Sequence, residues 1–374
     1  MRLHLLLLDE GFMSGAHTAV GLRDAGCDVT IVGATGGRGR YDGRSIRWSL
    51  APRVTSPEFL SCVDQLVRRH TYDYVLPLTE PIQALLWDSA PSWAQRIFPR
   101  TDQWQQAVLR DKRCLAALAA AHGIAVPDQL PLSDDASLDR SVESLGLPLV
   151  VKGSAGRGGS TTHVVNSLPA ARAAARRVRH AGVDVFAQRY VRGPTYLVGG
   201  TFRDGCPLRL YAGVKVAQHP RRTGPATIIK SYRDEQLLTA ALATIAAIGW
   251  TGIASMDFVR DAEGRFLLLE VNPRPWGSIG AAAAAGVDLF LPLIQLLRGE
   301  TTRQELRFRT HVEHPVFPLV LLSGEAWRSP ATLASALRDS RSDRAIWRPW
   351  GQGRHLAHRL CRVAHNWRRE ATAR

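Results

Sequence analysis

Three oxygen-bearing side chains, Asp257, Glu270 and Asn272, are spaced as the ligands of a metal ion would be. Glu270 and Asn272 stand two apart in an apolar run, and alternate residues of a strand face the same side. Asp257 is followed by an apolar pair and the turn-forming segment 260–265, so we expect a hairpin with Asp257 beside Glu270. Carboxylate and amide oxygens are the hard ligands that Mg²⁺ prefers. An exposed hairpin with unrelated acids is the alternative, but apolar strands rarely turn two polar groups onto one face.

Cationic groups that could bind phosphate accompany this pattern. Only four of the 48 Lys and Arg residues are lysines, at positions 112, 152, 215 and 230. A compact ammonium suits phosphate where a guanidinium does not fit. Lys152 ends an apolar run and precedes a glycine-rich segment whose backbone N–H groups could turn towards a polyphosphate, with Gly156, Gly158, Gly159 and Ser160. No Gly-Lys-Ser/Thr follows, so this is no Walker P-loop, and a flexible turn is the alternative.

Several weaker candidates for substrate binding lie near these groups. Arg274, just past a proline, could reach a phosphoryl group. Lys215 ends a predicted strand, and the following basic loop with Arg221 and Arg222 could hold an anionic substrate or an acyl phosphate; a solvated loop is equally compatible. Ser278 is a candidate N-cap for a helix over 279–286 that would offer N–H groups to a substrate carboxylate.

The first hundred residues alternate predicted strands and helices. The strands are expected at 3–8, 28–32 and 74–78 and the helices at 16–25 and 58–69, which predicts βαβ units and a parallel sheet. No G-x-G-x-x-G follows the first strand, so dinucleotide binding has no support. Segment 11–17 and the pair Thr79-Glu80 follow strands, where open α/β sheets bind ligands, although ordinary turns explain them equally well.

The segment from Asp257 to Arg274 resembles the metal-binding hairpin of the ATP-grasp superfamily, which includes carbamoyl phosphate synthase and D-alanine–D-alanine ligase. The other motifs occur in that family's order over about residues 1–300: Lys112 on a helix, Lys152 with its glycine-rich segment, then 185–191. The resemblance implies an α/β protein with the ATP-grasp fold. Its expected parts are an N-terminal Rossmann-like pre-ATP-grasp domain (1–100), a linker helix and glycine-rich lid subdomain (101–187), a C-terminal α+β metal-binding subdomain (188–300) and a basic extension (301–374).

The resemblance also implies a role for each motif. Asp257, Glu270 and Asn272 would bind Mg²⁺, with two ions expected and Mn²⁺ as a substitute. Arg274 would hold the transferred phosphate. Lys215 is the second catalytic candidate, and Glu80 joins the substrate-binding candidates. The implied contacts to ATP are Lys112, Lys152, Gly156, Gly158, Gly159, Ser160, Gln188, Arg189, Tyr190 and Val191.

Segment 185–191 resembles the interdomain hinge that receives adenine in this family. This hinge segment departs from the family pattern at two positions. Many members carry Glu where Arg189 stands, to accept from the adenine amine, and an acid near Thr195 for the ribose hydroxyls. Backbone groups at 189–191 could still read the base edge.

The implied reaction joins two small molecules. ATP phosphorylates a carboxylate, and an amine then attacks the acyl phosphate to give an amide, ADP and phosphate. Three alternatives stay open: an ATP-grasp enzyme with a non-amine acceptor, a catalytically silent nucleotide-binding regulator, and a basic scaffold.

The composition indicates the class of protein and its cellular compartment. The chain has 374 residues, 45% of them hydrophobic, and no apolar run near the roughly 20 residues of a membrane span, so we expect a globular protein. We expect no secretory signal at its start. The five cysteines are scattered and match no metal or redox motif, which favours a reducing cytoplasm, at positions 27, 62, 114, 206 and 361.

The net charge of +15 is concentrated near the C-terminus. Residues 338–374 contain ten arginines and three acidic residues, a net +7. An apolar helical stripe is predicted there, formed by Leu356, Leu360, Val363, Ala364 and Trp367. The stripe could dock on the parent domain, or anchor the protein at the inner face of a membrane or on an acidic partner. Nucleic acid is not expected, because no base-reading motif accompanies the charge. The sequence is also compatible with a homodimer.

Overall fold

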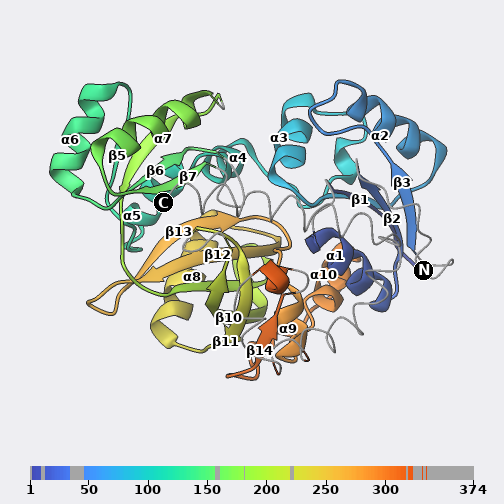
Figure 1. Cartoon of the computed structure of the whole chain (residues 1–374). Coiled ribbons are helices and arrows are strands. Elements are labelled where there is room, and N and C mark those ends of the chain that lie inside the picture. The colour runs from blue at the N-terminus through green and yellow to red at the C-terminus, as the bar shows by residue number, and fades with distance from the viewer. Residues whose placement is uncertain are drawn as a thin grey trace.

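The N-terminal part of the chain is a parallel sheet connected by helices (Figure 1). The computed structural model describes residues 2–9, 13–33, 46–155, 161–180, 182–219, 223–316, 319–322, 331 and 334. The sheet has the order β3-β2-β1-β4, with strands β1 (His4–Leu8), β2 (Asp28–Gly33), β3 (Ile46–Leu50) and β4 (Tyr74–Pro77). The helices are α1 (Met13–Asp24), α2 (Glu58–Arg69) and α3 (Glu80–Ser89). The predicted βαβ pattern is therefore confirmed.

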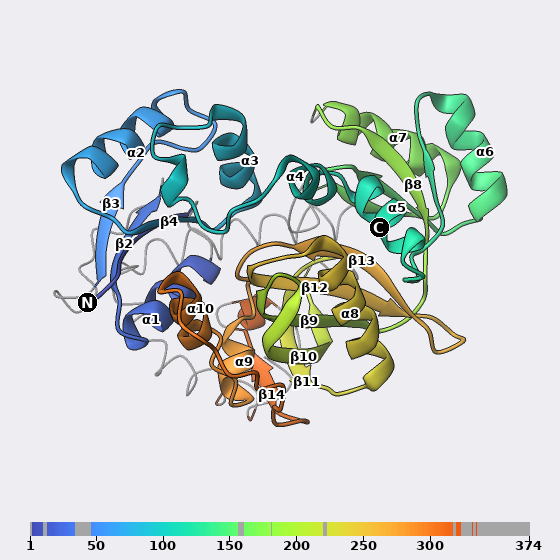
Figure 2. The ribbon, with the colours of Figure 1, turned by 180° about the vertical axis from the view of Figure 1, so that it is seen from behind.

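Residue periodicity explains these elements. Leu5 to Leu8 of β1 are all fully buried, because a central parallel strand is covered on both faces. On α2, Phe59, Val63 and Val67 recur every four residues and form its buried stripe. A short 3₁₀ turn (Ala94–Arg96), α4 (Gln103–Arg110) and α5 (Lys112–Ala121) then lead from this domain to the next sheet (Figure 2).

The second sheet is antiparallel and has the order β5-β8-β6-β7. Its strands are β5 (Gln129–Pro131), β6 (Leu149–Gly153), β7 (Thr162–Val165) and β8 (Val185–Arg189). Helices α6 (Asp135–Leu145) and α7 (Leu168–His180) pack on one face, over Leu149, Val151 and Ala187. The intervening residues of these strands, among them Lys152 and Gln188, face the other way.

The third sheet is also antiparallel and has the order β13-β12-β9-β10-β11-β14. Its strands are β9 (Thr195–Arg203), β10 (Cys206–Gln218), β11 (Ala226–Ser231), β12 (Gly252–Arg260), β13 (Phe266–Asn272) and β14 (Glu313–Pro315). Helix α8 (Glu235–Ile248) covers one face, with its N-terminus capped by Asp234. Residues past 300 thus complete this sheet through β14, although the sequence analysis assigned all of 301–374 to an extension.

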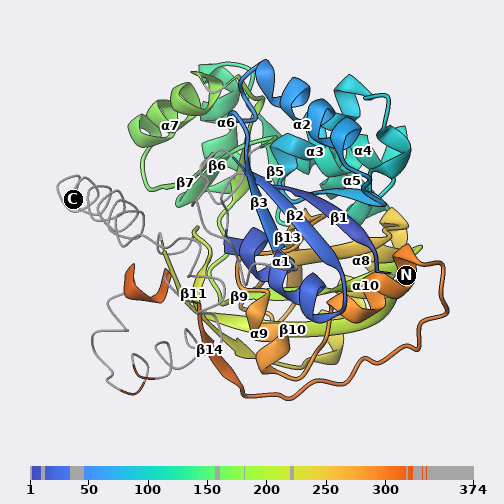
Figure 3. The same ribbon diagram turned by 90° about the vertical axis from the view of Figure 1, so that its right-hand side faces the viewer.

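The other face of the third sheet shares its core with the N-terminal domain. Helices α9 (Gly280–Ala284) and α10 (Phe290–Leu297) lie there, and a 3₁₀ turn (Leu319–Leu322) follows β14. Helix α10 contacts both α1 and β9 (Figure 3). Gly21 allows the close approach of α1, because a Cβ there would overlap the ring of Phe290. The hydroxyl of Tyr74 donates to the carbonyl of Leu297 at 2.6 Å. The N-terminal domain is therefore docked directly on the third sheet.

None of the helices in the described residues is both long and apolar enough to cross a membrane.

Candidate active site

The hairpin of β12 and β13 brings the predicted metal ligands together. Asp257 pairs with Glu270 and Ser255 with Asn272 in the antiparallel register, which confirms the predicted hairpin. The amide nitrogen of Asn272 lies 3.4 Å from Oε1 of Glu270. One oxygen of Asp257, Oδ1, is buried and has no hydrogen-bond partner in the structure. Two carboxylates and an amide therefore meet on one face of the third sheet.

Lysine side chains surround these carboxylates. Lys215 Nζ lies 2.6 Å from Oδ2 of Asp257, and both side chains are largely buried. Lys215 does not end its strand as predicted, since β10 continues to Gln218. Lys152 is also buried and donates to the carbonyl of Leu269, next to Glu270, at 3.5 Å. Two of the four lysines thus approach the β12–β13 hairpin from different sheets.

Burial and charge together set the protonation of this cluster. Burial raises the pKa of Asp257, and the attraction of Lys215 opposes that rise. Burial would also raise the pKa of Glu270, but the ammonium groups of Lys112, Lys152 and Lys215 outweigh it and lower that pKa. Burial lowers the pKa of Lys152 to about 8. Glu270 is therefore the more firmly ionised carboxylate of the pair.

The donor set fits a hard divalent cation. The unpartnered Oδ1 of Asp257 is a buried anionic oxygen without a counter-donor, which is the environment that a cation satisfies. Glu270 and Asn272 add a carboxylate and an amide oxygen on the same strand. The described residues contain no group of three or more His, Cys, Asp or Glu side chains arranged for a metal. The candidate site therefore consists of two acids and one amide, with phosphate and water oxygens expected to complete the shell of Mg²⁺.

Arg274 is held at the edge of this cluster by the N-terminal domain. Its Nη2 lies 2.6 Å from Oε1 of Glu80, in the first turn of α3, and 3.4 Å from Oδ1 of Asn272. Gln83, one turn further along α3, donates to the carbonyl of Pro273 at 2.8 Å. The sequence indicated Glu80 but missed Gln83, which carries no signal of its own. These contacts place Arg274 and Glu80 beside the β12–β13 hairpin.

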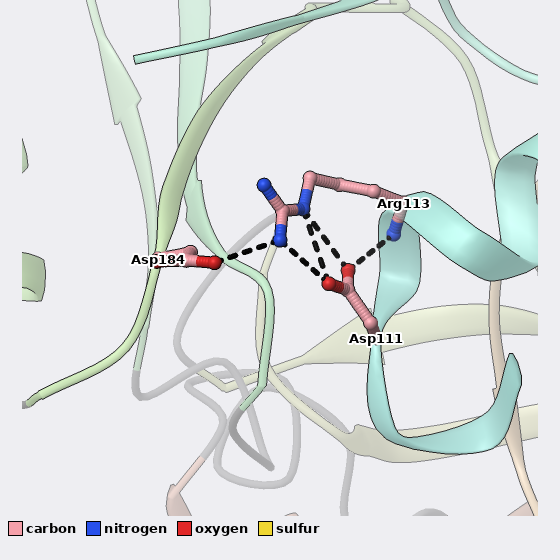
Figure 4. Close-up of polar contacts among 3 residues, drawn as sticks. All are labelled: Asp111, Arg113 and Asp184. Carbon is pink, nitrogen blue, oxygen red and sulfur yellow. Dashed lines mark hydrogen bonds and ion pairs between the residues drawn. The ribbon is translucent and has the colours of Figure 1, made fainter. Parts of the chain in front are cut away.

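Lys112 is positioned by contacts at the start of α5. Its backbone N–H donates to the carbonyl of Ser154 at 3.1 Å, just past β6. Arg113 bridges Asp111, the N-cap of α5, and Asp184, which precedes β8, with Nη2 2.7 Å and 2.8 Å from their carboxylates (Figure 4). Helix α5 is therefore fastened to the second sheet at its N-terminal end.

The hinge residues divide between two faces of the second sheet. Arg189 turns its side chain to Asp128, with Nε 2.8 Å from Oδ2, and its backbone N–H donates to the carbonyl of Asp128. Gln188, one residue earlier, faces the opposite way and is 5% exposed. Tyr190 and Val191 lie between β8 and β9, outside both strands. Gln188 therefore lines a pocket together with Leu268 and Leu269 of β13.

A pocket lies between the second sheet, α5 and β13. Leu115, Phe186 and Leu268 are among its apolar lining residues. Gln188 and Gln129, which are paired across β8 and β5, contribute its amide groups, and Lys112 also lines it. A pocket with apolar walls and a few polar groups is typical of a small-molecule site.

The segment after Arg274 corrects one prediction. The helix is short: α9 spans Gly280–Ala284 and its N-cap is Ile279, without a side-chain cap bond. Ser278 is buried and is not the N-cap, and its carbonyl accepts from the N–H of Ala281. The expected array of free N–H groups at a long helix N-terminus is therefore wrong. Trp276 instead packs over Gly199 of β9, where any side chain would collide with the indole ring, and this holds the segment against the sheet.

Some predicted site residues lie outside the described part of the chain. They are Gly156, Gly158, Gly159 and Ser160 of the glycine-rich segment, Arg221 and Arg222 of the basic loop, and the tail 338–374.

Comparisons with known proteins match parts of this chain. A family model described as "ATP-grasp in the biosynthetic pathway with Ter operon" matches residues 208–315, which include Lys215, the β12–β13 hairpin and Arg274. The D-alanine–D-alanine ligase of Chromohalobacter salexigens is 31% identical over 204 residues. This match covers 50% of the chain and 64% of that ligase, which is less than two thirds of its length.

Solved structures extend the similarity over more of the chain. An L-amino acid ligase from Bacillus licheniformis has a TM-score of 0.62 at 18% identity, over 79% of this chain and 73% of that one. A biotin carboxylase from Campylobacter jejuni has a TM-score of 0.68 at 16% identity, over 83% and 74%. The chain thus has the α/β ATP-grasp fold, and its resemblance to the ATP-grasp superfamily is confirmed in both sequence and structure.

Proposed function

We propose that this protein is an ATP-dependent carboxylate–amine ligase acting on small molecules. The main support is the convergence of two carboxylates, Asp257 and Glu270, with the cations of Lys152, Lys215 and Arg274 at the end of the β12–β13 hairpin. Phosphoryl transfer requires positioning and charge neutralisation rather than a protein nucleophile, and these groups supply both. Two similar proteins are named D-alanine–D-alanine ligase and L-amino acid ligase, which favours an amine as the acceptor.

The first step would activate the carboxylate. One of its oxygens attacks the γ-phosphorus of ATP, the bond from that phosphorus to the β–γ bridging oxygen breaks, and ADP leaves. Lys152 would neutralise phosphate charge in the ground state, and Arg274 would hold the phosphoryl group as it moves. Mg²⁺ held by Asp257, Glu270 and Asn272 would further neutralise the phosphate oxygens.

The second step would form the amide. A neutral amine attacks the acyl carbon, the bond from that carbon to the phosphate oxygen breaks, and inorganic phosphate leaves. The amine nitrogen loses one proton to solvent. Closure of the site around the acyl phosphate would protect it from water, which otherwise hydrolyses it.

The test is an ADP-release screen of the full chain across pairs of carboxylates and amines, followed by mass measurement of the product. We expect ADP and phosphate in equal amounts, dependent on both substrates, and a product heavier than either. ADP release that needs no amine would point to another acceptor. Nucleotide binding without turnover on any pair would indicate a regulator instead of a ligase.

A further inference from the structure

We propose that Gln83 is a positioning residue, which holds Asn272 and Arg274 in place through the backbone of Pro273. Its side-chain Nε2 donates to the carbonyl of Pro273 at 2.8 Å, and Pro273 is the one residue between Asn272 and Arg274. This inference rests on the proposed function, because it assigns Asn272 to Mg²⁺ and Arg274 to the transferred phosphoryl group.

The chain reverses sharply at Pro273. The N–H of Arg274 donates to the carbonyl of Asn272 at 2.8 Å, which closes a three-residue turn centred on Pro273. The proline ring fixes φ near the value that such a turn requires, and proline has no N–H of its own. The carbonyl of Pro273 takes no part in the turn bond. Because Pro273 is buried, that carbonyl needs a donor from another part of the chain, and Gln83 supplies it.

Gln83 lies on a helix that is firmly packed. It is 2% exposed, and its backbone N–H donates to the carbonyl of Thr79 at the start of α3. Ile82 and Leu86 of the same helix are buried in the core of the N-terminal domain. A side chain on a packed helix places its donor more precisely than a side chain on a loop. The amide of Gln83 therefore fixes the turn relative to the N-terminal domain.

Two contacts from α3 act on different parts of the same segment. Glu80 and Gln83 are three residues apart, so they face the same side of the helix. Glu80 is charged and contacts the guanidinium of Arg274, whereas the neutral amide of Gln83 contacts a backbone carbonyl. Loss of the Gln83 amide therefore changes the geometry of the site and leaves its charge unaltered.

A shift of the turn would move both site residues together. Nη2 of Arg274 lies 3.4 Å from Oδ1 of Asn272, the amide oxygen proposed for Mg²⁺. A displacement of about 1 Å at a reacting group can lower a rate about 100-fold. Groups that orient a metal ligand are worth about 10- to 100-fold in metal affinity or activity. We therefore expect Gln83 to affect both phosphoryl transfer and metal binding, although its own contact is to the backbone.

The first experiment compares Gln83→Leu with the wild type as full chains. Mn²⁺ replaces Mg²⁺, and its binding in the presence of ADP is followed by electron paramagnetic resonance. We expect the dissociation constant for Mn²⁺ to rise about tenfold. With the substrate pair identified by the ADP-release screen, kcat should also fall about tenfold or more. The dissociation constant of ADP without metal should change by less than about threefold, because no contact to the nucleotide alone is lost.

Gln83→Glu adds a pH signature that a general loss of stability would not produce. The introduced carboxyl donates to the carbonyl of Pro273 when protonated, but it can only accept when ionised. The neighbouring charges of Glu80 and Arg274 are paired with each other, so burial dominates and raises the pKa of the introduced carboxyl. Relative to the wild type, Mn²⁺ affinity and kcat should be nearly normal at low pH and fall as the pH rises through that pKa. Gln83→Leu should show no such fall.

Gln105→Leu is the matched control, because it removes a similar bond away from the site. Nε2 of Gln105 donates to the carbonyls of Ile248 and Gly249 at 3.0 Å and 3.1 Å, between α4 and the end of α8. This variant should lower the melting temperature but keep wild-type Mn²⁺ affinity and kcat. Losses equal to those of Gln83→Leu would assign the effect to general stability and overturn the inference.

The remaining outcomes separate this inference from the proposed function. Wild-type Mn²⁺ affinity and kcat in folded Gln83→Leu would overturn the role of Gln83 and leave the proposed ligase intact. If Gln83→Leu does not fold, the pH profile of Gln83→Glu decides, and a profile parallel to that of the wild type would count against the inference. A wild type that binds Mn²⁺ and ADP but releases no ADP from ATP with any pair would overturn the ligase, while the Mn²⁺ titrations still test Gln83. A wild type that binds neither would overturn both.

Discussion

Arg274, just after β13, and Glu80 of α3 form an ion pair 2.6 Å long between the third sheet and the N-terminal domain. Their side chains are 11% and 29% exposed, so solvent screens the pair only partly. The bond from Gln83 to the carbonyl of Pro273 runs beside it. The N-terminal domain therefore positions the cation that the proposed chemistry assigns to the phosphoryl group.

Glu80→Gln should weaken this coupling while keeping the size of the side chain. We expect kcat/KM for the carboxylate to fall about tenfold, since Arg274 loses its charged partner, and the free energy of unfolding to fall by about 1–3 kcal/mol. A double-mutant cycle with Arg274→Ala measures the interaction by chemical denaturation. Additive losses in the cycle would show that the two residues are not coupled.

Glu270→Gln and Asn272→Ala should each reduce ADP formation by about 100-fold or more. Preorganised electrostatic groups are worth this much, and these side chains are the proposed ligands of Mg²⁺. The melting temperature should stay near the wild-type value. Glu263→Gln, in the exposed turn of the same hairpin, is the control and should keep wild-type turnover. Wild-type turnover in the two site variants would refute the metal assignment.

Lys152→Ala should weaken ATP binding about tenfold or more, and by more than Arg274→Ala does. Lys152 is proposed to contact phosphate in the ground state, where a charge-assisted hydrogen bond is lost on truncation. Arg274 is proposed to act on the phosphoryl group during transfer, so its loss should lower kcat more than affinity. Nucleotide titration of both variants checks the order. Equal ATP affinity in Lys152→Ala and the wild type would contradict it.

The pKa of Lys152, lowered by burial to about 8, predicts a pH dependence of ATP binding. Below that pH the ammonium is charged and attracts phosphate; above it the charge is lost, so affinity should fall as pH rises from 7 to 9.5. Bound phosphate favours the charged form and should shift the midpoint above 8 in the complex. Lys152→Arg, which stays charged over this range, should flatten the profile. A fall of equal size in Lys152→Arg would assign the effect to another group.

Removal of the basic tail, as a 1–337 variant, should leave ADP release unchanged. The metal and phosphate candidates all precede residue 275, whereas the tail carries a net +7. We expect the full chain, but not the variant, to sediment with anionic liposomes at low salt, because each basic residue near such a surface contributes roughly 1 kcal/mol. High salt should reduce this binding. Equal sedimentation with a large loss of melting temperature would make the tail a structural element.

Local sequence signals explain which parts of the site could be predicted. The pairing of Asp257 with Glu270 follows from strand periodicity and from a turn between two strands that are neighbours in the sequence. It could therefore be predicted from the sequence alone. The Arg113–Asp184 pair joins residues 71 apart, and no local pattern encodes that contact. The helix expected over 279–286 spans only Gly280–Ala284, and Trp276 packs on Gly199 just before it, a contact that no local pattern encodes. Arg189 was expected to read the base only through its backbone groups, and no local pattern showed that its side chain pairs with Asp128, 61 residues earlier.

The clamp formed by Asp111, Arg113 and Asp184 has a mechanical consequence. It lies beside the bond from Lys112 N–H to the carbonyl of Ser154, so the second sheet is pinned to α5 at one corner. Helix α5 itself packs on the third sheet through Leu115 and Ala119. A rotation of the second sheet that keeps these bonds must pivot about that corner. In such a rotation the displacement of a residue grows with its distance from the pivot. Lys112 and Lys152 would therefore move little, while α6, which is farther from the pivot, would move most.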